Sequence, residues 1–156
     1  MLKINSDLQG DVLNLELNGS IDENAQFAEQ VGEVSASEVH VICREIPRIN
    51  SVGVKAWIKF FQTVSEKGAK LVFKECSTAI VEQMNLISNF RCGGEVESVY
   101  VPFTCEDCGH ELVGLFNAEQ IKAANFEIPN LQCSKCHSEN AEFDDIKEEY
   151  FHFLMD

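Results

Sequence analysis

Four of the seven cysteines in this 156-residue chain form two Cys-x-x-Cys pairs. The first pair is Cys105 and Cys108, the second is Cys133 and Cys136, and 24 residues separate Cys108 from Cys133. Each pair can direct two thiolates at one ion, and four sulfurs complete the tetrahedral shell that Zn²⁺ adopts in structural sites. The spacing therefore predicts one structural zinc ion held by these four cysteines.

Two other uses of the cysteines stay open. Iron in a rubredoxin-like site is the alternative metal, and a thiol redox protein that cycles its Cys-x-x-Cys pairs is the alternative function. Redox pairs normally begin a helix in a thioredoxin-like unit, which is not evident here. His110 and His137 could replace a ligand or support one, but four cysteines already fill a structural site and leave no position for water or substrate. We therefore expect no enzyme activity.

The residues around the pairs favour a zinc ribbon. Gly109 suits the tight turn after the first pair, residues 112–116 can return as a strand, and Asn117 can cap a short helix. Many zinc ribbons bind nucleic acid, but residues 101–156 carry 3 basic and 12 acidic side chains, and residues 1–100 carry 9 and 14. Because nucleic-acid affinity depends on basic side chains, we expect no nucleic-acid partner and no binding to an acidic membrane surface.

The first hundred residues precede the ribbon and must position it. Their hydrophobic residues recur with the spacing of strands and of helices in turn. An apolar stripe at helical spacing follows Asp22 as far as Val34, and another follows the Asn50–Gly53 turn. We predict strands at 3–8, 13–17, 39–43, 70–73 and 96–103, and helices at 22–34, 52–67 and 77–90. This order indicates an α/β fold with a mixed sheet.

The same stretch resembles a STAS domain, the module of sulfate transporters and bacterial anti-sigma-factor antagonists. The resemblance rests on three short motifs in order: Leu17-x-Gly19-x-Ile21-Asp22, then Asn50-Ser51-Val52-Gly53 before a helix, then Lys67-Gly68-Ala69-Lys70-Leu71-Val72 before a strand. It implies a STAS-like domain over residues 1–103, followed by a zinc-ribbon domain with a C-terminal amphipathic helix over residues 104–156. Without a linker, the two should be rigidly coupled.

The resemblance also implies a role in signalling through a protein partner, such as a kinase-like anti-sigma factor. In such antagonists the hydroxyl before the loop glycine is phosphorylated, and here Val52 occupies that position. Ser51 is expected to cap the helix, with phosphorylation as the alternative. The implied partner surface comprises Asn50, Ser51, Val52, Gly53, Ala56 and Phe60. A small-ligand sensor stays open as a further alternative, because STAS-like domains can bind ligands.

The C-terminal residues 144–154 predict an amphipathic helix with a capping box at Asp145 and Glu148. Its apolar face, with Ile146, Tyr150, Phe153 and Leu154, must be covered either by the rest of the chain or by a partner such as a second copy in a homodimer. Because the chain shows no leader and no apolar run of ~18 residues, we expect a cytoplasmic protein of bacterial type.

Overall fold

The computed structural model describes residues 1–155, and its strands form two sheets. The first sheet has the order β1-β2-β3-β4-β5, in which β1 runs antiparallel to β2 and all other neighbours are parallel. Its strands are β1 (Lys3–Gln9), β2 (Val12–Asn18), β3 (Glu38–Glu45), β4 (Lys70–Lys74) and β5 (Glu95–Val96). This mixed sheet with its helices confirms the predicted α/β fold class.

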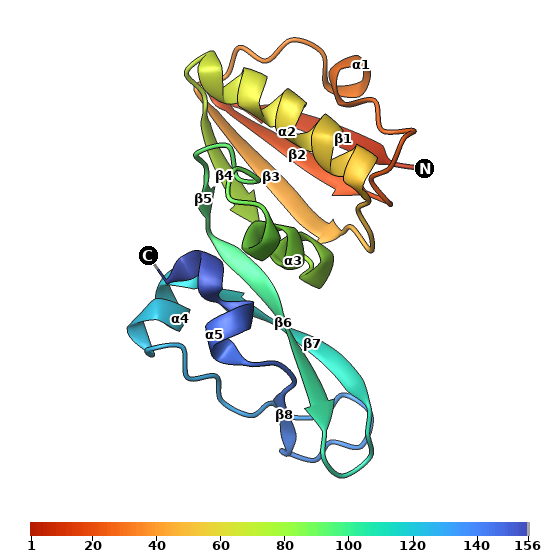
Figure 1. Cartoon of the computed structure of the whole chain (residues 1–156), viewed down its shortest axis with the longest axis vertical. Helices are drawn as coiled ribbons and strands as arrows, with labels where there is room; N and C mark the ends of the chain where they lie inside the picture. The colour runs from red at the N-terminus through yellow and green to blue at the C-terminus, as the bar shows by residue number, and fades with distance from the viewer. Residues whose placement is uncertain (156) are drawn as a thin grey trace.

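Three helices connect successive parallel strands: α1 (Phe27–Val31), α2 (Ser51–Glu66) and α3 (Thr78–Leu86). Because right-handed crossovers between strands in simple sequential order all return on the same side, these helices lie to one side of the sheet, where α1 and α2 pack together and α3 lies at the end next to β6 (Figure 1). Trp57 of α2 lies at the centre of that layer. Its ring stacks on Phe90 at 4.7 Å and on Phe73 at 5.6 Å, and its Nε1 donates to the Phe90 carbonyl.

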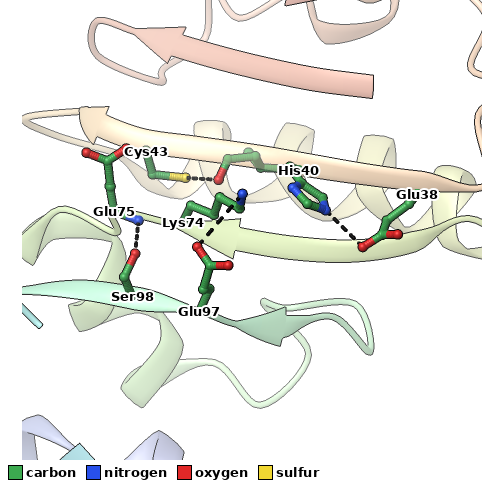
Figure 2. Close-up of polar contacts among 8 residues, drawn as sticks. Glu38, His40, Cys43, Lys74, Glu75, Glu97 and Ser98 are labelled. Atoms are coloured by element: carbon green, nitrogen blue, oxygen red, sulfur yellow. Dashed lines mark hydrogen bonds and ion pairs between the residues drawn. The ribbon is translucent and has the colours of Figure 1, made fainter. Parts of the chain in front are cut away.

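The opposite face of the first sheet carries polar side chains in pairs. Figure 2 shows His40 of β3 with its Nε2 2.9 Å from a Glu38 carboxylate oxygen, and Lys74 of β4 facing Glu97. These side chains alternate with the buried Val39, Val41 and Cys43, as expected for a sheet covered on one side only. His40 is thus a hydrogen-bonded structural residue of this face.

A second, three-stranded sheet has the order β7-β6-β8, and both of its pairs are antiparallel. It comprises β6 (Ser98–Cys105), β7 (Glu111–Asn117) and β8 (Ala141–Phe143), with α4 (Ala118–Ala123) after β7. The strand predicted over 96–103 is present but divided between the two sheets. Glu95 and Val96 pair with β4, whereas Ser98–Cys105 forms β6, which pairs with β7 and β8 and reaches the first sheet only through a bridge between Val99 and Cys76. The domain division at residue 103 stays a prediction.

Two expected helices are much shorter in the structure. The helix expected over 22–34 is only Phe27–Val31, because the Asp22 carboxylate accepts the Asn24 N–H in a turn and Gly32 (φ 76°) ends the helix. The expected C-terminal helix is reduced to α5 (Lys147–Tyr150) and a 3₁₀ turn (His152–Leu154). No capping box forms there, since Asp145 accepts from the adjacent Ile146 N–H.

The C-terminal segment is covered by the chain itself. Tyr150, Phe153 and Leu154 are buried, while Ile146, expected on the same face, is 56% exposed. The side chain of Asn85, on α3, donates to the Tyr150 carbonyl and accepts from the Phe153 N–H. The buried side chains form one cluster that runs from the first sheet through α3 into the second sheet. Across residues 1–155, no helix is long and apolar enough to cross a membrane.

Candidate metal centre and the α2 surface

The four predicted ligands meet at one end of the second sheet. The sulfur atoms of Cys105, Cys108, Cys133 and Cys136 all lie within 4.8 Å of one another, and the Cys105–Cys136 and Cys108–Cys133 distances are 3.6 Å. Four sulfurs at ~2.3 Å from one tetrahedral ion would lie ~3.8 Å apart, whereas a disulfide bond would require ~2.05 Å. The thiols therefore have the spacing of a four-sulfur metal site.

Two equivalent turns position the thiols. In the first turn, Gly109 donates its N–H to the Cys105 carbonyl, and the Cys105 N–H reaches the carbonyl of His110. In the second turn, His137 and Ser138 make the same two bonds with Cys133. Gly109 and His137 both adopt a positive φ, 75° and 64°. Gly109 thus forms the turn that the sequence predicts, and His137 provides the same backbone conformation at the second pair rather than a ligand.

The topology around the turns is compatible with a zinc ribbon. The first turn joins β6 to β7, and the second precedes β8, which pairs with β6. The long separation between the cysteine pairs is filled by β7, α4 and the irregular residues that follow α4. The Asn117 side chain caps α4 by accepting the N–H groups of Glu119 and Gln120, as predicted.

Their surroundings shift the pKa values of the Cys133 and Cys136 thiols in opposite directions. The backbone N–H groups of Cys136 and Lys135 lower the pKa of the Cys133 thiol to about 6. At Cys136 the Ser138 N–H also lowers the pKa, but desolvation and the neighbouring thiols outweigh it and raise the pKa to about 12. A bound divalent cation would remove this conflict, because it stabilises all four thiolates at once. The donor set therefore fits a metal ion.

A polar bridge between the two turns has no counterpart in the sequence analysis. The Asp107 carboxylate, between the first two cysteines, accepts hydrogen bonds from the Ser138 hydroxyl and from the Asn140 side chain. Both bonds lower the pKa of Asp107. Because neither spacing nor residue type singles out these three residues, only the folded arrangement of the turns reveals them.

The second candidate site is the N-terminus of α2. Its cap is Asn50, whose side chain accepts the Gly53 N–H at 2.8 Å, so the expectation that Ser51 is the cap is wrong. Asn50 also donates to the Glu23 carboxylate. This carboxylate places a negative charge beside the helix end, where an anionic ligand or phosphoryl group would otherwise be favoured. Ser51 and Val52 are exposed at the tip.

The other residues of the implied partner surface lie deeper. Gly53 is buried against the chain after β2, and a Cβ there would meet the Ile21 carbonyl oxygen at 2.1 Å. Ala56 and Phe60 line a groove of about 350 Å³ between α1 and α2, in which Phe60 stacks on Phe27 at 5.5 Å. The accessible part of the surface is thus the tip formed by Asn50, Ser51 and Val52, together with this groove.

No protein-family profile matches the chain, and no curated protein matches it.

Proposed function

We propose that this protein is a non-enzymatic protein-interaction module, in which an α/β domain resembling a STAS domain is joined to a zinc ribbon with a structural Zn(Cys)₄ site. The observation that carries this proposal is the closed set of four thiols within 4.8 Å. With four protein ligands, an ion has no open position for water or substrate, so its contribution is to the folding free energy.

The position of the thiols argues against the redox alternative. Two sulfur–sulfur contacts of 3.6 Å join cysteines of different pairs, Cys105 with Cys136 and Cys108 with Cys133, and all four sulfurs surround one point rather than forming two separate couples. A redox Cys-x-x-Cys motif instead closes a disulfide within one pair, at a helix N-terminus that lowers the pKa of the attacking thiol. Here both pairs lie in turns that adjoin β-strands.

The proposed partner surface is the exposed tip of α2 with the neighbouring groove. Val52 is 50% exposed although it is apolar, and Ser51 beside it is also exposed. Because Val52 replaces the hydroxyl expected from the resemblance and Glu23 adds negative charge nearby, we propose that binding here is constitutive rather than switched by phosphate. A signalling protein of the anti-sigma-factor or kinase-like class is the partner that the resemblance suggests, in the cytoplasm of a bacterium.

Val52→Glu tests the partner surface without threatening the fold. The added carboxylate lies in the first turn of α2, where attraction to the helix dipole, about 0.3–1 kcal/mol, is offset by repulsion from the nearby Glu23 carboxylate. We expect the intact, metal-loaded variant to melt close to the wild-type temperature and to lose the proteins that the wild type captures from its host. Asn130→Glu adds the same charge in an exposed loop and should capture them as the wild type does. Equal capture by both variants would exclude the α2 tip.

A cleft of about 860 Å³ favours one further candidate, a small-ligand sensor. It lies where β2 and β3 end and α3 begins, and Tyr100 and Val113 of the second sheet close it on one side. Ligands of parallel α/β sheets bind at such strand ends. Native mass spectrometry of the protein from its host tests this candidate, since a retained small molecule lost in Tyr100→Ala would support it, and a bare protein would count against it.

A further inference from the structure

The described chain has two seven-residue edge strands, β1 and β7, and only β7 lacks charged side chains along its centre. It is the outer strand of the second sheet, and its only backbone ladder is with β6. Its five central residues, Leu112 to Phe116, include no charged residue and no proline. Natural edge strands normally carry lysine, proline or a bulge, because a row of free N–H and C=O groups otherwise pairs with another strand.

Two of the large exposed apolar side chains stand side by side on this strand. Val113 is 52% exposed and Leu115 is 49% exposed, and both point to the same face because side chains alternate along a strand. Directly opposite them on β6 lie Pro102 and Tyr100, which are only partly buried. The other face is filled by the chain itself, since a Cβ at Gly114 would meet Leu131 at 2.6 Å.

The sequence of β7 complements itself in an antiparallel pair. With a two-fold axis at Gly114, Val113 lies opposite Leu115 of the second copy, and Leu112 lies opposite Phe116. At each end Glu111 faces Asn117, so no like charges meet. All seven residues of the strand pair in this register, and apolar side chains stay on matching faces. Shifting the axis to residue 115 would leave Glu111 and Leu112 without strand partners, because the residues opposite them, Glu119 and Ala118, belong to α4.

We propose that β7 is a self-association edge, through which a second copy pairs antiparallel about a two-fold axis at Gly114 and joins the two three-stranded sheets into one. This contact is isologous, so it closes as a dimer rather than growing into a fibre. It does not depend on the C-terminal segment, whose Tyr150, Phe153 and Leu154 are covered within one chain.

The net charge gives the association a characteristic salt response. Each copy carries a net charge of −14, and the proposed contact itself pairs no charges. Long-range repulsion between copies is screened by salt, with a Debye length of ~10 Å at 0.1 M. Dimerisation should therefore strengthen as ionic strength rises, whereas an interface made of ion pairs would weaken.

The test is sedimentation velocity of the intact, metal-loaded protein at several concentrations in low and high salt. We expect a monomer–dimer equilibrium that shifts to dimer with salt. Leu115→Lys, which places a charge on the edge, should raise the dissociation constant about tenfold or more. The matched control is Leu8→Lys, because Leu8 is 61% exposed on β1, the other long edge strand, and this variant should dimerise as the wild type does.

Hydrogen exchange locates the contact. In the dimer, amide exchange within Glu111–Asn117 should slow as protein concentration rises, while exchange in β1 stays constant. A monomer under all conditions would overturn the proposal. A dimer that Leu8→Lys disrupts, or one in which β7 gains no protection, would overturn it as well.

Discussion

Gly53→Ala should destabilise the protein, although the same change inside a helix normally stabilises it by ~0.8–1.0 kcal/mol. Gly53 is the third residue of α2, and its new Cβ would lie 2.1 Å from the Ile21 carbonyl oxygen and 2.6 Å from the carbonyl carbon. Ordinary contact requires ~3.5 Å, so the helix end must retreat by roughly 1 Å or more. Both nearest atoms belong to backbone, which cannot turn aside as a flexible side chain would.

The retreat has two costs. Overpacking of this kind costs about 1–3 kcal/mol. It also stretches the hydrogen bonds that dock the loop, from the Asn50 N–H to the Ile21 carbonyl and from the Ile21 N–H to the Arg48 carbonyl, each worth about 0.5–1.5 kcal/mol net. After the helix-propensity gain is subtracted, we expect a net loss of about 2–4 kcal/mol in the free energy of unfolding.

Urea denaturation followed by the fluorescence of Trp57 measures this loss. Trp57 is the only tryptophan, it is fully buried, and it belongs to α2 itself. Gly10→Ala is the control: Gly10 has a positive φ of 64° but open space around its missing Cβ, so only the backbone strain of about 1–2 kcal/mol should appear. If Gly53→Ala unfolded at the wild-type urea concentration or above it, the inferred contact between α2 and Ile21 would be refuted.

Two further substitutions test hydrogen bonds that hold the C-terminal segment and the cysteine turns in place. Asn85→Ala removes both hydrogen bonds to the C-terminal segment and should cost about 1–3 kcal/mol; faster amide exchange confined to residues 147–155 would confirm the cause, and unchanged exchange there would contradict it. Asp107→Ala removes the bridge between the cysteine turns and should speed metal transfer to a chelator about threefold to tenfold, since such supporting contacts orient ligands. Asp144→Ala, which breaks a carboxylate contact with Thr104 within the second sheet, should leave the transfer rate unchanged.

The sequence predicted best those features that are encoded locally. The alternation of Leu13, Leu15 and Leu17 places β2 correctly, and the four-cysteine spacing identifies the thiols that the fold brings together. Asn117 likewise caps α4 as its position suggested. In each case the signal is a periodicity or a short spacing, and the geometry of the strand, turn or helix fixes where those side chains lie.

Features that depend on contacts between distant parts of the chain could not be predicted from local patterns. β6 has the composition of a central strand, and nothing local tells whether it joins the first sheet or the second. The helix expected after Asp22 is short because that carboxylate forms a turn with Asn24 instead of a cap, and both outcomes use the same residue type. Asn50 and Ser51 are both residue types that cap helices well, so residue type does not distinguish them. The start of α2 depends instead on the close packing of the Gly53 backbone against the Ile21 carbonyl.

The most direct test of the central claim is native mass spectrometry of the freshly purified protein, combined with alkylation of its thiols before and after chelation. We predict one zinc ion per chain, with Cys105, Cys108, Cys133 and Cys136 protected from alkylation until a chelator removes the metal and the second sheet unfolds. A metal-free protein with a disulfide inside either Cys-x-x-Cys pair would contradict the structural site and favour the redox alternative. Iron in place of zinc would keep the four-sulfur site and change only the ion.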